Sequence, residues 1–218
     1  MKHTARHLTL VAALSLVSLA ASAGRPLAVD DANTNDKGKG HVEAWLTKAD
    51  GVSLFSIAPA YAVGEGLEIG GLLSRESNSG LRVSAAQLKW RITASQAQGC
   101  NVAATLGVTR ASIGGASASG SYVTGLGSCN FGQHGSAHAN LGMTRVNGGG
   151  GTATSWGIAY ERAFGAVTPH IEWFGSEGSK PTLQIGLRGQ VADNLQLDGS
   201  VGVVDGETIY SLGVKFTF

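Results

Sequence analysis

The chain has 218 residues, a formal net charge of +1, and 33 glycines against only 4 prolines. Because Lys and Arg are scattered singly and the net charge is near zero, no basic surface is expected and we exclude a nucleic-acid partner. The glycines follow no G-X-Y period, which excludes collagen, and the length favours a single domain.

The first residues have the order of a secretory signal peptide. Lys2 and Arg6 precede an apolar run over residues 8–19, and Ala-Ser-Ala follows at 21–23. That run is shorter than the roughly 20 apolar residues of a transmembrane helix. We therefore predict that residues 1–23 are a cleaved signal peptide. Residues 24–39 are then an N-terminal periplasmic or plug segment, ahead of a barrel at 40–218.

From residue 40 onward, apolar and polar residues alternate in segments of about ten, bounded by Gly, Asp, Asn or Ser turns, as in barrel strands. The segments lie near residues 40–48, 52–62, 66–76, 81–92, 100–111, 119–129, 136–144, 155–161, 168–174, 182–190, 195–203 and 207–218. Helices are disfavoured, because no segment keeps an i, i+3, i+4, i+7 apolar stripe and Gly interrupts each candidate. We predict about 12 strands, with ten or fourteen as the alternatives.

Two cysteines, Cys100 and Cys129, fall in neighbouring predicted strands. An even cysteine count suits an exported chain in an oxidising compartment. Gly114-Gly115 is a candidate two-residue turn, and pairing about it opposes Cys100 to Cys129 and Leu106 to Val123. We predict a cross-strand disulfide, with two free thiols or a slipped register as the alternatives. Two cysteines without a close His pair fall short of a zinc site, and we predict no metal.

The C-terminal segment alternates most clearly. Its apolar parity holds Tyr210, Leu212, Val214, Phe216 and Phe218. Aromatic residues at a strand end are typical of the girdles of membrane barrels. We therefore predict an all-β protein: a single antiparallel transmembrane β-barrel with short loops, in the lipid of the bacterial outer membrane. Tyr210, Phe216 and Phe218 are expected to form its assembly signal, recognised by periplasmic chaperones and the barrel-assembly machinery; the oligomeric state is left open.

If the apolar parity faces lipid, polar and charged residues face the lumen. The predicted lumen-lining residues are Glu43, Glu68, Lys89, Arg91, Glu161, His170, Glu172, Arg188, Asp198 and Lys215. Acidic and basic groups nearly balance, which predicts weak ion selectivity. The alternative is that these side chains only fill the barrel.

Residue types for acyl chemistry are present without a motif. They are Ser136, Ser155, His138, His170, Glu161 and Glu172. No spacing ties them into a nucleophile, base and acid set, so we predict no catalytic residue, no enzyme activity and no cofactor. Asp30, Asp31 and Asp36 lack the spacing of a calcium loop, and the glycines at 148–151 lack the Lys of a phosphate loop.

The sequence at 25–43, RPLAVDDANTNDKGKGHVE, resembles the start of outer-membrane proteins of the MetA-pathway phenol-degradation family. The matching residues are Arg25, Pro26, Leu27, Asp30, Asp31, Ala32, Gly38, Lys39 and Glu43, while Val29 stands where Thr is common. The motif is short, and the resemblance implies a channel or transporter-like role for small or aromatic compounds.

Our leading hypothesis is therefore a passive outer-membrane channel for small solutes. The first alternative is a closed structural or interaction barrel, filled by residues 24–39 or by its own side chains. The second is a lipid-modifying barrel enzyme. The sequence names no substrate.

Overall fold

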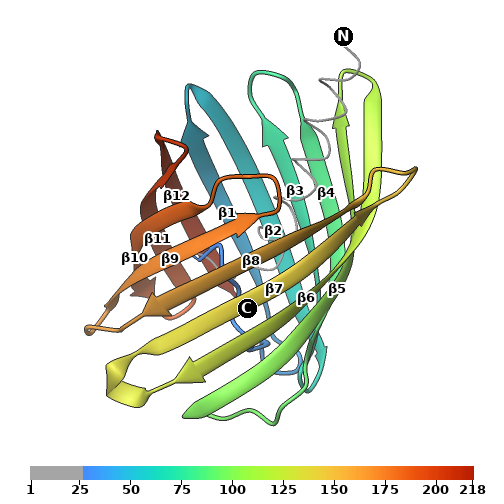
Figure 1. The fold of residues 1–218 in the computed structure, drawn as a ribbon. Helices are drawn as coiled ribbons and strands as arrows, with labels where there is room; N and C mark the ends of the chain where they lie inside the picture. Colours follow the sequence, from blue (N-terminus) through green and yellow to red (C-terminus); the bar gives the residue numbers. More distant parts are fainter. Residues whose placement is uncertain (1–26) are drawn as a thin grey trace.

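A computed structural model describes residues 27–218, so the predicted signal peptide lies outside the described residues. These residues form one closed antiparallel barrel in which neighbours in sequence pair and β1 pairs with β12 (Figure 1). The strands are β1 (Gly40–Ala49), β2 (Val52–Gly64), β3 (Leu67–Glu76), β4 (Arg82–Arg91), β5 (Gly99–Ile113), β6 (Ala116–Asn130), β7 (Ser136–Val146), β8 (Thr152–Glu161), β9 (Val167–Ser176), β10 (Thr182–Ala192), β11 (Leu195–Val204) and β12 (Glu207–Thr217). The predicted 12-strand barrel is confirmed. A 3-10 helix, η1 (Gly132–His134), lies between β6 and β7. Within residues 27–218, no helix is long and apolar enough to cross a bilayer.

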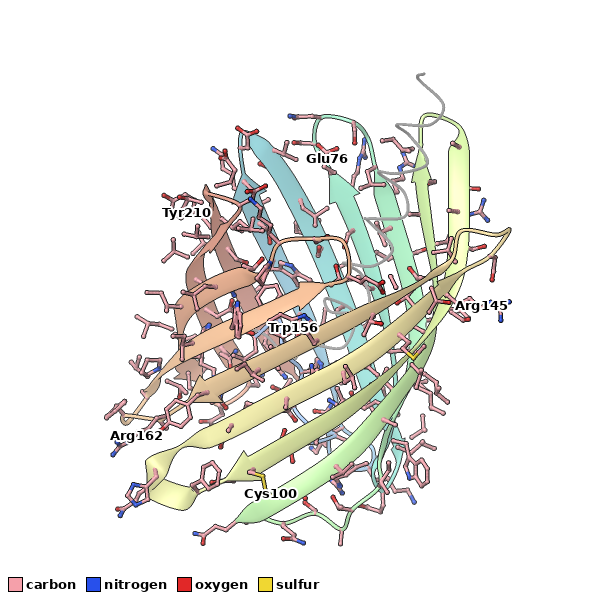
Figure 2. All side chains as sticks on the ribbon, viewed as in Figure 1. Glu76, Cys100, Arg145, Trp156, Arg162 and Tyr210 are labelled. Atoms are coloured by element: carbon pink, nitrogen blue, oxygen red, sulfur yellow. A yellow bond between two sulfur atoms is a disulfide. The ribbon has the colours of Figure 1, made fainter. Side chains whose placement is uncertain are left out.

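Side chains alternate between the lumen and the outer face along each strand. In β7, His138 and Asn140 are buried, whereas Leu141 and Met143 are 64% and 52% exposed. Figure 2 shows side chains on both faces of the ribbon, and Trp156 packs edge-on against Trp173 with ring centroids 4.8 Å apart. A continuous exposed apolar surface of this extent belongs against acyl chains rather than water, because large apolar patches are rare on soluble monomers.

Tight turns set the register of three hairpins. Asp50-Gly51, Gly114-Gly115 and Asp205-Gly206 all have positive φ at both positions, from 44° to 84°. Two consecutive positive φ values define the type I′ turn, whose twist matches that of paired strands. Each turn is therefore bounded by directly opposed residues, such as Ile113 and Ala116.

Both ends of the barrel sequence lie at one end of the barrel, here called the terminal end; the opposite end is called the hairpin end. Gly40 and Phe218 exchange two backbone hydrogen bonds of 2.9 Å, which extend the β1–β12 seam to this end. A Cβ at Gly40 would lie 2.7 Å from the Phe218 ring, so this position requires glycine. From the even strand number and bacterial barrel architecture, we expect the terminal end to face the periplasm.

Candidate functional site

The ten predicted lumen residues all lie on the inward parity of their strands, and several oppose one another across the sheet. Glu43 is the cross-strand partner of Lys215, and their charged atoms are 3.1 Å apart. Glu161 lies 2.8 Å from Arg188, which is itself opposed to Asp198. Since acids face bases on neighbouring strands or across one intervening strand, the wall neutralises much of its own charge.

Of the other predicted lumen residues, His170 and Glu172 lie together on β9, and Arg91 lies at the terminal end. His170 Nε2 lies 3.7 Å from Glu172 Oε1, and both side chains are fully enclosed. Gln184 on β10 donates to the same Glu172 oxygen over 3.0 Å. Arg91 is the last residue of β4 and stands apart at the terminal end.

The segment ahead of β1 lies in the lumen, and we call residues 27–35 the strap. Side chains of the wall bind its backbone. The amides of Ala28 and Val29 donate to Glu172 Oε2 over 2.6 and 2.8 Å. Further along, the amide of Ala32 donates to Ser128 Oγ over 2.8 Å. Three backbone groups that the strap could not satisfy by itself are thus paired inside the barrel.

Side chains of the strap bind two more of the predicted lumen residues. Lys89 Nζ donates to Asp30 Oδ1 over 3.0 Å. Asn35 donates to Glu68 Oε2 through its backbone amide (2.9 Å) and its side chain (2.7 Å). Lys89 and Glu68 are also cross-strand partners, so Asp30 and Asn35 of the strap bind neighbouring residues of the wall.

Small wall residues make room for the strap. Leu27 and Val29 pack against Ala159 on β8. Next to it, a Cβ at Gly157 would lie only 2.7 Å from Val29 Cγ2. Ala32 packs against Leu126 in the same way on β6. The glycine on β8 is therefore a strap contact.

Not every inward side chain is polar. Trp45, Leu72, Val83 and Tyr122 are buried on the inward parity and pack together toward the hairpin end. None of these four residues was among the predicted lumen-lining residues. Interiors of small barrels are filled by side chains. These four side chains fill the part of the lumen toward the hairpin end by packing on one another.

Two polar cavities flank the strap, and Asp31 and Asn33 line both. The smaller has a volume of about 180 Å³ and is lined on the wall by Glu43, Glu68, Lys89 and Lys215 among others. The larger has a volume of about 380 Å³ and is lined by His138, Glu161 and Arg188 among others. Both have room for water or a small polar group. Among residues 27–218, no cluster of His, Cys, Asp and Glu is arranged to hold a metal ion.

The barrel brings together a serine, a histidine and an acid that the sequence did not link. Ser128 Oγ lies 2.7 Å from His138 Nδ1, and His138 Nε2 lies 3.6 Å from Glu161. Ser128 Oγ also accepts the Ala32 amide, and the distance to Glu161 exceeds that of a hydrogen bond. The contacts made here hold the strap, and the sequence candidates Ser136 and Ser155 take no part in them.

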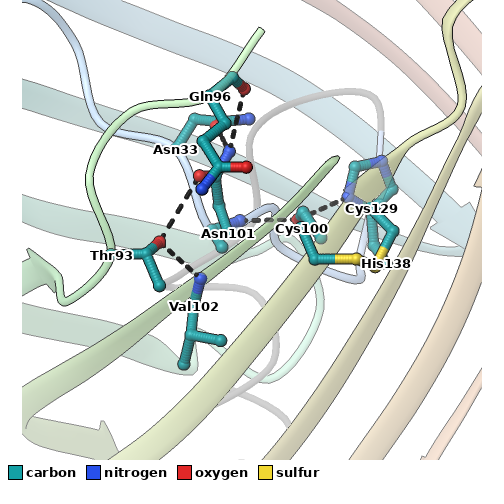
Figure 3. Close-up of a disulfide and its surroundings, with 10 residues drawn as sticks. Asn33, Thr93, Gln96, Cys100, Asn101, Val102, Cys129 and His138 are labelled. Carbon is teal, nitrogen blue, oxygen red and sulfur yellow. Dashed lines mark hydrogen bonds between the residues drawn. A yellow bond between two sulfur atoms is a disulfide. The ribbon is translucent and has the colours of Figure 1, made fainter. Parts of the chain in front are cut away.

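The predicted disulfide is present. Cys100 on β5 and Cys129 on β6 are direct partners with Cα atoms 4.0 Å apart, in the register set by the Gly114-Gly115 turn (Figure 3). Leu106 opposes Val123 in the same register. Both cysteines lie on the outward parity near the terminal end, so the bond fastens the wall there and leaves the lumen free.

The aromatic residues expected to guide assembly are on the outer face. Tyr210, Phe216 and Phe218 are 57%, 45% and 53% exposed. The rings of Phe216 and Phe218 stack with centroids 6.4 Å apart. Their exposure leaves them accessible to a partner, and their role in assembly stays a prediction.

Sequence reasoning missed the wall residues that surround the strap. Ser128 accepts a strap amide, His138 contacts Ser128, and Asn101 contacts a strap side chain. Asn101 Nδ2 donates to Asn33 Oδ1 over 3.2 Å (Figure 3). Their inward parity was readable from the alternation, but nothing in it indicated a partner from the N-terminal segment.

Comparisons with known proteins agree with this architecture. A family model described as "Uncharacterised conserved protein UCP029691" matches residues 10–210. No curated protein matches the chain by sequence. Among solved structures, the KdgM porin is similar over 82% of this chain and 99% of its own, with 13% identity and a TM-score of 0.65. A second KdgM structure, in complex with disordered oligogalacturonate, gives a TM-score of 0.66 with 13% identity over the same shares of the two chains.

Omp33 of Acinetobacter baumannii is similar over 84% of this chain and 99% of its own, with 7% identity and a TM-score of 0.54. Likeness at such identities shows the fold alone, which is that of outer-membrane porins. Neither the family model nor these structures connects the chain to phenol degradation.

Proposed function

The chain belongs to the family whose model spans residues 10–210, and we propose that it is an outer-membrane channel for passive passage of small polar solutes. The observation that carries this proposal is a closed barrel with an apolar outer belt around a largely polar interior of balanced charge. Opposed pairs such as Glu43 and Lys215 keep the interior wettable without giving it one sign. We therefore expect passage of neutral or zwitterionic solutes with weak ion selectivity.

The strap supports a second candidate, a barrel that is closed at rest. It crosses from β9, where Glu172 binds it, to β3, where Glu68 binds it. Most of its anchors are single hydrogen bonds or one ion pair, which are individually worth about 0.5–3 kcal/mol. A strap held in this way can leave the lumen without unfolding the wall.

Conductance of the refolded chain in planar bilayers tests both candidates. The chain from residue 24 onward is compared with the chain from residue 40 onward. We expect small or rare conductance steps from the first and larger, longer steps from the second. Circular dichroism of both controls for folding. If neither folded chain gives conductance or liposome swelling with any small solute, the channel proposal fails; equal conductance would eliminate the strap as the obstruction.

A reversible lock sharpens the test. The Val29→Cys/Gly157→Cys variant places one cysteine on the strap and one on the wall. A Cβ added at Gly157 lies 3.7 Å from Val29 Cβ. That separation suits a disulfide. We expect the oxidised variant to lose the openings of the parent chain and to regain them on reduction. The parent chain under the same reductant is the control, because reduction also opens Cys100–Cys129.

Two further hypotheses concern aromatic solutes and enzyme activity. A preference for aromatic solutes is supported only by the motif at 25–43, and competition of phenol with sugars in liposome swelling would test it. We propose no enzyme activity. A lipid-modifying enzyme would alter lipopolysaccharide acylation on overexpression, and the change would disappear in His138→Ala or His170→Ala; we expect no change to begin with.

A further inference from the structure

Four arginines stand on the outward parity of the barrel toward its hairpin end, where a membrane protein meets lipid headgroups. They are Arg75 on β3, Arg82 on β4, Arg110 on β5 and Arg145 on β7, all exposed. The lumen does not use them. Charge on the outer face of a barrel is tolerated near the interface and costly at mid-membrane, so their depth suits the interface.

Three of these arginines line one groove on the outer face, with a volume of about 390 Å³. Arg75 and Arg82 are direct cross-strand partners. Arg110 is the diagonal neighbour of Arg82 on the same face, because Arg82 opposes Ser112 and Arg110 lies two residues before Ser112 on β5. Three arginines on adjacent strands thus line the groove together.

The part of the chain that the structure describes supplies no counter-charge to this cluster. Like charges directly opposed across a sheet destabilise it. Within residues 27–218, none of the three arginines forms an ion pair with a carboxylate, and Arg110 donates only to Ser117 Oγ over 3.3 Å. The neighbouring carboxylate of Glu76 accepts from its own loop, including the Ser79 amide over 2.8 Å. An external anion would remove the repulsion.

Apolar side chains line another part of the groove, which indicates the kind of anion. Phe55, Ile57 and Leu73 line it on β2 and β3, where Phe55 is the cross-strand partner of Arg75, and Phe55 and Leu73 are 53% and 60% exposed. The groove therefore places exposed apolar side chains directly beside guanidinium groups, as a bound lipid places its acyl chains beside its headgroup. At the terminal end, by contrast, the outward residues include Tyr61, Trp90 and Phe216, which carry no charge.

We propose that this groove binds a phosphorylated lipid of the outer leaflet, the lipid A part of lipopolysaccharide. The phosphate lies among Arg75, Arg82 and Arg110, whose planar guanidinium groups can each make two parallel hydrogen bonds to phosphate oxygens. An acyl chain lies along Phe55, Ile57 and Leu73. The hairpin end faces the outer leaflet if the terminal end is periplasmic, as expected for the barrel. The site is independent of whether the lumen conducts.

Lipid binding to the folded chain from residue 24 onward, measured by native mass spectrometry in detergent, tests the proposal. The probes are diphosphorylated lipid A and the same lipid with both phosphates removed. We expect the phosphorylated lipid to bind at least about tenfold more tightly, because removing the phosphates removes the charge-assisted hydrogen bonds. Equal binding of the two lipids would overturn the proposal without need of any variant.

Two matched variants locate the site. Arg75→Gln/Arg82→Gln/Arg110→Gln should lower lipid A affinity at least about tenfold. Lys37→Gln/Lys39→Gln/Arg162→Gln removes three exposed cations near the terminal end and should leave it unchanged. Equal losses in both variants would show attraction to overall charge and overturn the assignment. Competition by inorganic phosphate as strong as that by lipid A would also overturn it, since the apolar part of the groove would then contribute nothing.

Discussion

The wall of the barrel and the strap inside it are held by different kinds of contact. Every strand of the wall is hydrogen-bonded on both sides, and β5 and β6 are additionally joined by a disulfide. The strap belongs to no sheet and depends on side chains such as Glu172, Ser128 and Lys89. Because separating two strands exposes unpaired backbone groups to lipid, the wall should unfold as a unit. The strap, by contrast, can detach alone. Mutations in the two regions should therefore affect different measurements.

The largest effect is expected from a charge at the middle of the outer face of the wall. Leu141 is the central residue of β7 and is 64% exposed. Leu141→Arg should lower the free energy of unfolding by about 2–4 kcal/mol, because a cation at the bilayer midplane loses its hydration. Equilibrium unfolding by urea in lipid vesicles measures it. Val63→Arg, near the terminal end of β2, is the control and should cost at most about 1 kcal/mol.

If Leu141→Arg cost no more than its control, the outer face would not be in contact with acyl chains at that depth. Something other than lipid would then have to cover the apolar belt, and the result would contradict a membrane-spanning wall.

A somewhat smaller effect is expected from the disulfide. Cys100 and Cys129 are separated by 29 positions in sequence, and the bond restricts the unfolded chain over that loop. Cys100→Ala/Cys129→Ala should lower the free energy of unfolding by about 2–3 kcal/mol. Conductance should not change, because both cysteines face outward. A change in conductance without loss of stability would contradict the separation between wall and strap.

The wall could be predicted from the sequence because its information is local. Alternation with a period of two identifies strands, and the Gly114-Gly115 turn alone was enough to pair Cys100 with Cys129. The sequence underestimated the length of several strands, most of all in this hairpin: the predicted segments at 100–111 and 119–129 are Gly99–Ile113 and Ala116–Asn130. The tight turn lets pairing continue to Ile113 and Ala116, which excludes the slipped register that was the alternative.

The contacts of the strap could not be predicted in the same detail. Parity places Lys89 and Ser128 on the inward face but does not choose their partners. Lys89 binds Asp30 across 59 positions of sequence, and Ser128 binds the backbone of Ala32, which has no side-chain pattern to detect. From the sequence, Gly157 is only a glycine on the inward parity of its strand, and the position of Val29 shows what it accommodates. The inward Trp45 and Tyr122 also escaped detection, because alternation alone treats such residues as lipid-facing.

The smallest effect on the wall, and the most informative for the strap, is expected from Glu172→Gln. Glutamine keeps the size and one accepting oxygen but loses the charge, and hydrogen bonds to a charged group are stronger by roughly 1 kcal/mol. The strap should therefore detach about fivefold more often. Hydrogen exchange at the Ala28 and Val29 amides should accelerate, while urea unfolding should stay within about 0.5 kcal/mol of the parent. Glu177→Gln is the matched control, because Glu177 accepts the Thr154 amide at the hairpin end and does not contact the strap. Were Glu172→Gln to weaken the wall as much as Leu141→Arg, the strap would be part of the cooperative unit, and its release could not gate the lumen.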